Sequence, residues 1–324
     1  MSKPVLKYST QKYIEKIDTE IRNILGDEIP ILSKLKDYTV ESGGKRVRSI
    51  LVCLLAELYG ELEDDIFTLA AVIEIIHAAS LLHDDVLDNS LTRRGKPSGK
   101  EIFGSKEVIL GGDYMLACAI RKLNDYENPA LMDVFTRVIR DLSISELVQM
   151  EYANNSDITL DIYYKIIYGK TASLFQTACE AVAIYTQKSK VEIEAIGNFG
   201  KNLGLLFQIR DDYLDYFNNT LLNKSAFQDF ENGYYTYPVL IVREKGIPEV
   251  SKRIENLFNL KHSDRTEKNV HKDILKILNE NNAQDLTRER INELFSLISE
   301  QLNSFPQSDY KNKIERQIEN LMNF

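Results

Sequence analysis

The stretch HAASLLHDDVLDNSLTRRGKPS at residues 77–98 changes character within two turns of a helix. It continues an apolar run of helical spacing and then gathers five charged residues: Asp84, Asp85, Asp88, Arg93 and Arg94. Residues four apart share a helical face, so Asp84 and Asp88 point the same way. Two carboxylates roughly 5–6 Å apart repel by about 3 kcal/mol at an effective dielectric of 20. The stretch therefore predicts a bound positive charge at the end of an apolar helix.

Apolar residues recur at three- and four-residue steps through most of the chain, which is the period of an amphipathic helix. The stripes lie at 14–25, 50–59, 66–82, 108–123, 131–152, 162–185, 191–217, 274–278 and 291–302. Sustained alternation is absent, and 7 Pro and 15 Gly give sparse punctuation. We therefore predict an all-α helical bundle of long helices and short loops, with a central cavity.

Glycine, proline and polar residues interrupt this pattern at 42–46, 93–100, 111–112 and 218–233. The last of these stretches is rich in Asn, Ser, Lys and Gln, so we expect a mobile loop there. No interruption has the length or composition of a linker. We predict a single domain over residues 1–324.

Composition and charge exclude several classes of function and location. The chain has 324 residues, 44% of them hydrophobic, and a formal net charge of −9, which argues against a nucleic-acid partner. Three scattered cysteines are typical of a reduced, cytoplasmic protein, and the N-terminus lacks the apolar core of a secretory signal. The run 69–82 is interrupted by Glu74 and His77 and is too short to span a bilayer. We expect a soluble cytoplasmic protein.

The acidic segment has an internal echo, because HDDVLD at 83–88 recurs as RDDYLD at 210–215 after a second apolar run. Carboxylate oxygens suit Mg²⁺, or alternatively Mn²⁺, which completes its coordination with water and phosphate oxygens. The predicted metal ligands are Asp84, Asp85, Asp88, Asp211, Asp212 and Asp215. If the two helices face each other, the clusters form the charged mouth of an apolar shaft, suited to a diphosphate head and a hydrocarbon tail.

Basic residues accompany both clusters. Arg93 and Arg94 follow the first, and Lys170 and Thr171 lie in the segment YGKTASLF. A basic loop, Lys45, Arg46 and Arg48, follows a glycine pair at 43–44 that allows a phosphate to approach backbone N–H groups. These patches predict two anion sites beside the two acidic ones.

Six segments, in order, resemble the trans-isoprenyl diphosphate synthases of the polyprenyl synthetase family over most of the chain. They are GGKRVR at 43–48, HDDVLDNSLTRRGKPS at 83–98, GGDYMLA at 111–117, GKTASLF at 169–175, GLLFQIRDDYLD at 204–215 and TYP at 236–238. The resemblance implies an all-α isoprenoid synthase fold, usually a homodimer. It also implies head-to-tail condensation of isopentenyl diphosphate with an allylic diphosphate.

The resemblance also implies individual roles. Asp84, Asp88 and Asp211 match metal-ligand positions, and Asp85, Asp212 and Asp215 complete the two clusters. The positions that match contacts to isopentenyl diphosphate are Lys45, Arg48, His77 and Arg94. Those that match contacts to the allylic diphosphate are Arg93, Lys170, Thr171, Gln208 and Lys224, of which Lys170, Thr171 and Gln208 are the expected catalytic residues. His77 precedes Asp84 by two helical turns, so it faces the mouth.

The chain departs from the family pattern at four positions. Ser49 stands where proline is usual, Lys100 where asparagine is usual, and Asn223 where a glycine usually precedes the lysine. Tyr234 stands where a second lysine for the allylic site is common, so one charge-assisted contact to the head group is missing or supplied elsewhere.

Product length follows from the helix before Asp84. A tail growing along that helix would meet Ser80, Ala79, Ile76, Ile73 and Val72. Relatives that make short products carry an aromatic residue four or five places before the first aspartate, where this chain has Ser80 and Ala79. The pocket is therefore expected to be open there, with a floor set by residues such as Phe135 or Val138. We expect an octaprenyl-like product, with a geranylgeranyl or farnesyl product as the alternative.

Two other interpretations stay open. A class I terpene cyclase would share the fold and the first cluster, but its second motif carries Asn and Ser or Thr instead of DDYLD. A non-catalytic subunit of a hetero-oligomeric synthase should have a decayed cluster, whereas both are intact; a catalytic subunit of such an assembly is a further alternative. In every case we expect no membrane span, with peripheral membrane association only through a lipid product.

Overall fold

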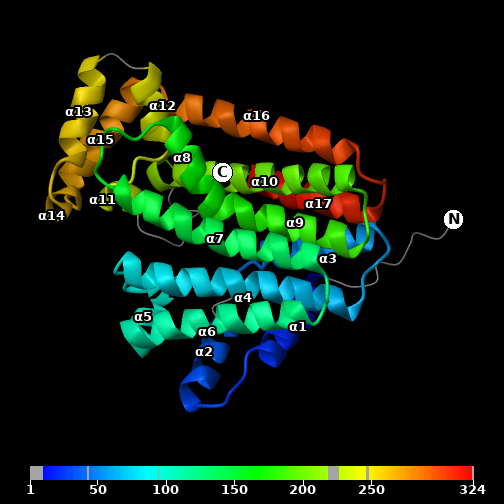
Figure 1. Ribbon diagram of the computed structural model, residues 1–324. Helices are drawn as coiled ribbons and strands as arrows, with labels where there is room; N and C mark the ends of the chain where they lie inside the picture. Colours follow the sequence, from blue (N-terminus) through cyan, green and yellow to red (C-terminus); the bar gives the residue numbers. More distant parts are fainter. Residues whose placement is uncertain (1–9, 42–43, 94, 218–225, 246–247, 323–324) are drawn as a thin grey trace. The chain divides into compact units, whose positions relative to one another are not determined.

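A computed structural model describes residues 10–41, 44–93, 95–217, 226–245 and 248–322. This part of the chain is almost entirely helical, and its strands are two short segments, β1 (Thr92–Arg93) and β2 (Lys96–Pro97). The predicted all-α class is confirmed (Figure 1).

Contacts divide the chain into two compact units. Unit 1 comprises residues 1–140, 174–201 and 300–319, and unit 2 comprises 141–173, 202–299 and 320–324. Five helices of the described residues run from one unit into the other: α7 (Pro129–Glu151), α9 (Ser173–Tyr185), α10 (Lys190–Phe217), α16 (Ala283–Asn303) and α17 (Asp309–Leu321). The single domain over 1–324 and the central cavity stay predictions.

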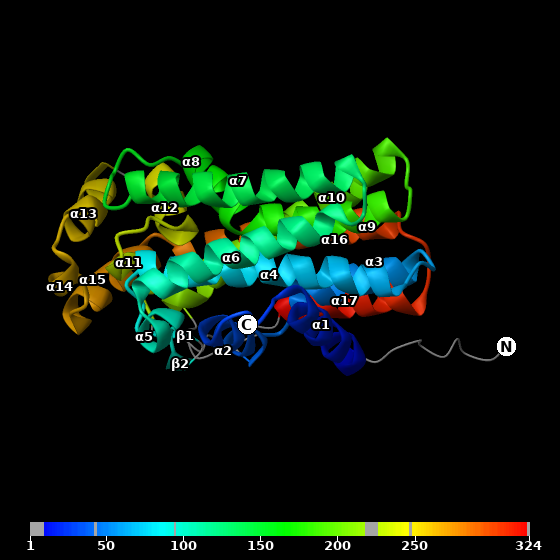
Figure 2. The same ribbon diagram turned by 60° about the horizontal axis from the view of Figure 1, so that its bottom comes forward.

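Unit 1 is built around one buried helix. The helices that belong entirely to unit 1 are α1 (Thr10–Ile24), α2 (Pro30–Glu41), α3 (Val47–Leu58), the buried α4 (Asp64–Leu87), α5 (Gly99–Phe103) and α6 (Ser105–Asn124). α4 packs against α1, α3 and α6, and Figure 2 shows α6 running along it. Every residue from Ile66 to Ile76 is buried. A helix that is apolar on all sides must be covered on all sides, which explains its central place in the unit.

The apolar run at 69–82 was judged too short to span a bilayer, but it is part of the longer helix α4. The helix has 24 residues and an 18-residue window of mean hydropathy 1.8, so by length and composition it could cross a membrane. Within the protein, 72% of that window is buried. Its apolar composition is accounted for by burial in unit 1.

The sequence predicted a helix over 108–123 and marked the glycine pair at 111–112 as an interruption of its pattern; the helix is confirmed, and the interruption is wrong. Both residues lie inside α6. A Cβ atom on Gly112 would lie 2.4 Å from Nε2 of His83, and one on Gly111 would lie 2.6 Å from Cδ1 of Leu35. The glycines are there because neighbouring side chains approach α6 closely, and the helix continues through them.

After α4 the chain forms a tight hairpin. β1 pairs antiparallel with β2, with Arg93 opposite Lys96. Gly95 in the turn has a φ of 75°, a left-handed conformation that glycine adopts without a steric cost. The Ser98 side chain then accepts a hydrogen bond from the Glu101 N–H and caps α5. The hairpin places Arg93 beside the end of α4.

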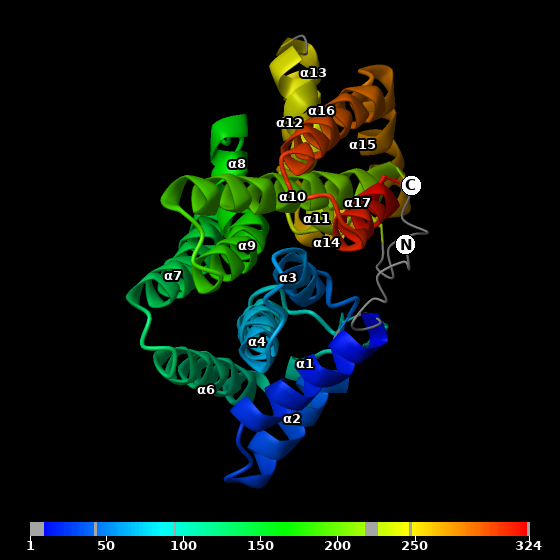
Figure 3. The ribbon, with the colours of Figure 1, turned by 90° about the vertical axis from the view of Figure 1, so that its right-hand side faces the viewer.

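The other helices belong to unit 2, and Figure 3 shows α12, α13 and α15 close together. These other helices are α8 (Leu160–Ile167), η1 (Tyr168–Ala172), α11 (Gln228–Glu231), α12 (Tyr237–Lys245), α13 (Pro248–Phe258), α14 (His262–Arg265) and α15 (Lys268–Glu280). α12 contacts α8, α13 and α15. The expected loop at 218–233 is a short helix at α11, and residues 218–225 lie outside the described residues.

Candidate active site

The outer aspartates of the first cluster share one face at the end of α4. The Asp88 N–H donates to the Asp84 carbonyl at 2.8 Å, so the helical repeat continues to Asp88. Both side chains are half-buried. This confirms the i, i+4 geometry expected from the sequence and leaves two carboxylates partly accessible.

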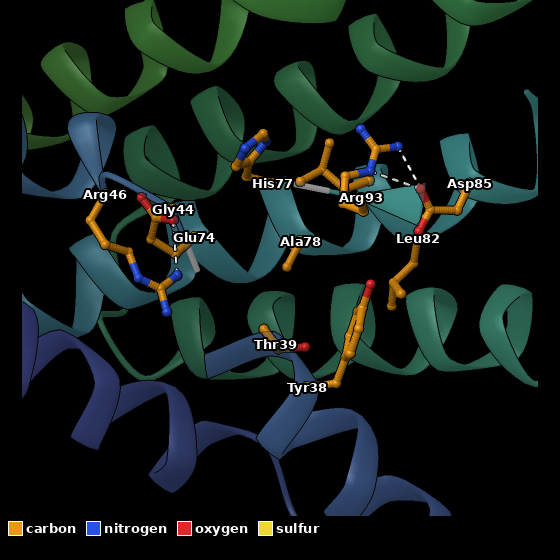
Figure 4. A pocket seen from close by; sticks show the side chains of 11 residues that line it. Tyr38, Thr39, Gly44, Arg46, Glu74, His77, Ala78, Leu82, Asp85 and Arg93 are labelled. Atoms are coloured by element: carbon orange, nitrogen blue, oxygen red, sulfur yellow. Dashed lines mark hydrogen bonds and ion pairs between the residues drawn. The ribbon is translucent and has the colours of Figure 1, made fainter. Parts of the chain in front are cut away.

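Asp85, between them, is engaged inside the protein. Its carboxylate is 2% exposed and accepts from Nε and Nη2 of Arg93 at 2.8 and 2.6 Å, and from the Gly99 N–H at 3.1 Å (Figure 4). Both guanidinium hydrogen bonds reach the same oxygen, Oδ1, and the Gly99 N–H donates to Oδ2; charge-assisted hydrogen bonds are among the stronger side-chain contacts. Asp85 therefore ties the hairpin and α5 to the end of α4 and has little capacity left for a metal ion.

Two arginines of the basic loop have different surroundings. Arg48 lies with its guanidinium carbon 4.5 Å from the Phe175 ring centroid and its Nη1 3.4 Å from Nε2 of His77. Arg46 is buried and pairs with Glu74 and Asp18. The structure thus brings Arg48 and His77 together as expected. Lys45 is exposed in the same loop, whereas residue 94 and residue 43 lie outside the described residues.

A cavity opens beside this loop, within unit 1. It has about 460 Å³ of empty volume, part of it open to solvent. Its lining includes Tyr38, Thr39, Gly44, Arg46, Glu74, His77, Ala78, Leu81, Leu82, Asp85 and Arg93. In Figure 4 the labelled Arg93, His77 and Arg46 side chains surround it, and the Tyr38 ring lies across from α4. Cationic and polar groups next to an apolar wall suit an anion that carries a short hydrocarbon.

The residues expected to line the tail pocket are tightly packed. Ile73, Ile76 and Ala79 have no exposed surface, and the Ser80 hydroxyl donates to the His77 carbonyl at 2.8 Å. Phe135 and Val138, predicted to form a floor, are also buried on α7. The described cavity is lined by other residues of α4, so the tail pocket stays a prediction.

The second cluster lies near the end of α10, in unit 2, and its middle residue is again buried. Asp212 accepts from the Tyr163 hydroxyl at 2.6 Å, Nε2 of Gln208 at 2.9 Å and the Tyr237 N–H at 3.3 Å. Burial, followed by the nearby charge of Asp229, raises the pKa of Asp212 to about 7. The carboxyl group holds α8, α10 and α12 together.

The outer aspartates of the second cluster differ from each other. The Asp211 side chain is 25% exposed and lies 3.4 Å from Nη1 of Arg210. Asp215 is buried and accepts from the backbone N–H groups of Gln228 and Asp229 at 3.2 and 3.3 Å. Of the three, Asp211 is the most exposed.

Lys170 and Thr171 occur in the π-helical turn η1, a rare form that often marks functional sites. The turn packs closely at Gly169, where a Cβ atom would lie 2.6 Å from the Asp141 carbonyl oxygen. The Thr171 hydroxyl donates to Oε1 of Gln208 at 2.6 Å, and Lys170 lies 2.8 Å from Glu146. Gln208 thus links Thr171 to Asp212. Lys170, the third expected catalytic residue, pairs with Glu146 instead.

The structure describes the contacts of three of the positions that depart from the family pattern. Ser49 is buried and donates its hydroxyl to the Arg46 carbonyl at 3.0 Å. Lys100 pairs with the Asn89 side chain across the hairpin. The Tyr234 N–H donates to the Asp229 carbonyl at 2.8 Å in the turn after α11. Positions 223 and 224 lie outside the described residues.

Sequence reasoning missed several residues that build the site. Tyr163 and Tyr237 hold Asp212, Glu146 holds Lys170, and Phe175 lies beneath Arg48. The only sequence signal was membership of the quoted segments, which include Phe175 and Tyr237 but neither Tyr163 nor Glu146.

In the described part of the chain, no three His, Cys, Asp or Glu side chains are grouped closely enough to hold a metal ion by themselves. Mg²⁺ needs only one or two carboxylates when water and substrate phosphates supply the remaining ligands. The partly exposed Asp84 and Asp88 fit that requirement, whereas Asp85 does not.

A helical fold that carries two Asp-Asp-x-x-Asp segments beside basic loops defines a prenyltransferase with the isoprenoid synthase fold. The comparisons with known proteins narrow this class. The chain belongs to the polyprenyl synthetase family, whose model matches residues 29–278.

Similar proteins of this family make long-chain prenyl diphosphates, according to their names. Solanesyl diphosphate synthase 2 of Arabidopsis thaliana is 34% identical over 309 residues, which cover 93% of this chain and 72% of that protein. Octaprenyl diphosphate synthase of Escherichia coli is 30% identical over 278 residues, with 86% and 85% covered.

Solved structures of polyprenyl synthases have the same fold as this chain. Heptaprenyl diphosphate synthase from Staphylococcus aureus superposes with a TM-score of 0.89 at 26% identity, covering 98% of each chain. A polyprenyl synthase from Caulobacter crescentus, in complex with calcium and isoprenyl diphosphate, gives a TM-score of 0.86 at 27% identity over 99% of each chain. The predicted family and fold are confirmed.

Proposed function

We propose that the chain adds isopentenyl diphosphate units head-to-tail to an allylic diphosphate and releases a long-chain all-trans polyprenyl diphosphate. The observation that carries the proposal is the end of α4, where the half-buried Asp84 and Asp88 flank Asp85, which lines a cavity together with His77 and Arg93. Family membership and the names of the relatives support the same reaction.

Asp84, Asp88 and Asp211 would hold Mg²⁺, with Mn²⁺ as the alternative. When bound, the metal supplies positive charge that stabilises the leaving diphosphate. Asp85, Asp212 and Asp215 belong to the same predicted set, and their contacts favour a supporting role. A similar structure that contains calcium and isoprenyl diphosphate supports the pairing of a divalent cation with a prenyl substrate.

The allylic diphosphate would be bound by residues of the η1 turn and the hairpin. Lys170, Thr171 and Gln208 are proposed to contact its oxygens, together with Arg93 and Lys224. Breaking the allylic C–O bond builds negative charge on the diphosphate, and cationic and hydrogen-bonding groups stabilise that charge where it develops. Gln208 is already oriented by Thr171 and Asp212, which reduces the reorganisation needed during reaction.

Isopentenyl diphosphate would occupy the cavity of unit 1. Arg48 and His77, with Lys45 and Arg94, are proposed to bind its diphosphate, while Ala78 and Leu81 form the apolar wall for its short hydrocarbon. Its double bond supplies the attacking electrons, so the protein needs no nucleophilic side chain. Position and exclusion of water are the protein's contribution.

The direct test is to incubate the purified protein with Mg²⁺, labelled isopentenyl diphosphate and a short allylic diphosphate, and then to size the product. We expect a polyprenyl diphosphate of about octaprenyl length and loss of the activity when the metal is chelated. A geranylgeranyl or farnesyl product would contradict the proposed length. A hydrocarbon without diphosphate would identify a terpene cyclase instead.

The tail pocket along α4 has its own test. Ala79→Tyr should shorten the product, because Ala79 has no exposed surface and a phenol ring there fills the proposed shaft. Overpacking costs about 1–3 kcal/mol, so Ala56→Tyr at an equally buried alanine of α3 is the matched control. An active Ala79→Tyr variant with an unchanged product would remove Ile73, Ile76, Ala79 and Ser80 from the length-determining pocket.

We further propose a homodimer in the cytoplasm, associated with membranes only through its lipid product. The three scattered cysteines support the cytoplasmic location, and the resemblance to a usually homodimeric family supports the dimer. Light scattering of the purified chain should give twice the chain mass. Activity that requires a second, different chain would support the hetero-oligomeric alternative.

A further inference from the structure

We infer that Arg46 is a positioning residue for the isopentenyl diphosphate site, acting through the basic loop before α3. This inference rests on the proposed function. The Arg46 side chain is 3% exposed, so it does not present its charge to solvent. Nη1 donates to Oε2 of Glu74 at 3.0 Å, and Nη2 donates to Oδ1 of Asp18 at 2.8 Å and to the Val40 carbonyl at 3.4 Å. One guanidinium therefore joins α1, α4 and the end of α2.

The backbone of Arg46 is constrained as well. It has φ 50° and ψ 34°, a left-handed conformation that is uncommon for residues other than glycine and costs of order 1 kcal/mol or more. Its carbonyl accepts from the Ile50 N–H at 2.9 Å and the Ser49 hydroxyl at 3.0 Å, at the start of α3. The side-chain contacts hold this turn in a shape that the chain would not favour alone.

The residues on either side of this turn are the proposed substrate ligands. Lys45 precedes Arg46 directly, and Arg48 follows two residues later, placed over Phe175 and beside His77. A shift of the turn would therefore move two cationic side chains that must meet one diphosphate. Displacements of about 1 Å can cost up to 100-fold in rate when they disturb reacting groups.

The positive charge of Arg46 also affects the cavity in which we propose that isopentenyl diphosphate binds. Glu74 lines the same cavity as His77 and Gly44, and its side chain is only 6% exposed. Without Arg46, the cavity wall would contain a buried carboxylate with no cation beside it at this point, and an approaching diphosphate would be repelled. Arg46 thus both shapes the loop and neutralises the wall behind it.

The test compares Michaelis constants for the two substrates in Arg46→Met. We expect the KM for isopentenyl diphosphate to rise about tenfold, the effect of one lost charge-assisted contact, while the KM for the allylic diphosphate stays within about twofold. Arg46→Lys keeps the charge but cannot bridge two carboxylates, so it should restore part of the loss. It also carries the test if Arg46→Met does not fold.

Arg137→Met is the matched control, because Arg137 also pairs with a buried carboxylate, Glu180, but does not line the cavity. It should leave the ratio of the two KM values unchanged. The inference is overturned if the folded Arg46 variants keep the wild-type KM for isopentenyl diphosphate, or if both KM values rise together. Absence of any prenyl product with the wild-type protein would refute the proposed function instead.

Discussion

The two acidic clusters have the same sequence pattern, yet their middle aspartates are held differently. Asp85 and Asp212 are each about 1% exposed. Asp85 is paired with the guanidinium of Arg93, whereas the hydrogen bonds to Asp212 come from the neutral Tyr163, Gln208 and Tyr237. The same residue in the same pattern is an ion-pair partner in one helix and a hub for neutral donors in the other.

The difference shows that partners, and not the motif, decide what a buried carboxylate does. Burial without a cation raises the pKa of Asp212 to about 7, with the charge of Asp229 adding to the effect. At the first cluster, the carboxylate of Asp85 accepts two charge-assisted hydrogen bonds from the guanidinium of Arg93. In both clusters the middle residue is buried and held by hydrogen bonds, while Asp84, Asp88 and Asp211 are more exposed and are the metal ligands that we propose.

The largest expected effect is a loss of kcat when a more exposed aspartate of the first cluster is replaced. Asp84→Asn should lower kcat by about 1,000-fold, because a proposed metal ligand that stabilises charge in the transition state is lost. Asp113→Asn, at a 62% exposed carboxylate on α6, is the control and should keep wild-type activity. Steady-state kinetics at saturating substrate measures both. An Asp84→Asn enzyme within tenfold of the wild type would contradict this assignment.

The second prediction concerns stability. Asp85→Asn should reduce the free energy of unfolding by about 3 kcal/mol, since it leaves the largely buried Arg93 without its counter-charge. Asp212→Asn should cost about 1 kcal/mol or less at pH 7, because the carboxyl group it replaces ionises only near that pH. Urea unfolding of the metal-free proteins gives both values. Equal losses would mean that the two environments are equivalent.

The pH dependence of stability sharpens the same contrast. The unfolded chain releases the Asp212 proton near pH 4, while the folded chain keeps it up to about pH 7. The free energy of unfolding of the wild type, relative to Asp212→Asn, should therefore be greatest below pH 4 and fall by up to roughly 4 kcal/mol as the pH rises to 7. Unfolding curves between pH 4 and 8 measure this difference. Parallel curves would rule out a raised pKa at Asp212.

The smallest expected effect is the loss of stability when a single hydrogen-bond donor to Asp212 is removed. Tyr163→Phe deletes the hydroxyl that donates to Asp212 at 2.6 Å and should cost about 1–2 kcal/mol of stability. Tyr59→Phe is the control, because the described contact of that ring is with the Lys188 ammonium group and is independent of the hydroxyl. Thermal denaturation compares the two variants. A loss no larger than that of Tyr59→Phe would show that Asp212 does not depend on this donor.

Much of the fold follows from local pattern. Apolar periodicity predicted the long helices, and the order of the charged segments predicted the family. The glycine pair in α6 was misinterpreted because a glycine required by close packing looks, in sequence, like one required by a turn. The π-helical turn η1 escaped prediction because the segment YGKTA continues the apolar helical spacing of residues 162–185, which does not distinguish a π-helical turn from an α-helical one.

The candidate site was predictable as a set of residues but not as a set of roles. The donors to Asp212 at Tyr163 and Tyr237 lie 49 and 25 residues away in sequence, so no local pattern reports them. In the basic loop, Arg46 and Arg48 are two residues apart but have different environments. Arg46 is buried between two carboxylates, and Arg48 lies over an aromatic ring. Chemical type identified the candidates, and long-range packing sorted them.

The most direct test asks whether both clusters act on one diphosphate. The measurement is a double-mutant cycle of the dissociation constant for an unreactive allylic diphosphate analogue in Mg²⁺, with Asp84→Asn, Asp211→Asn and the double variant. We predict a coupling free energy of at least about 1 kcal/mol, because residues that share one bound metal–diphosphate group are not independent. Losses that add within about 0.5 kcal/mol would contradict a shared site.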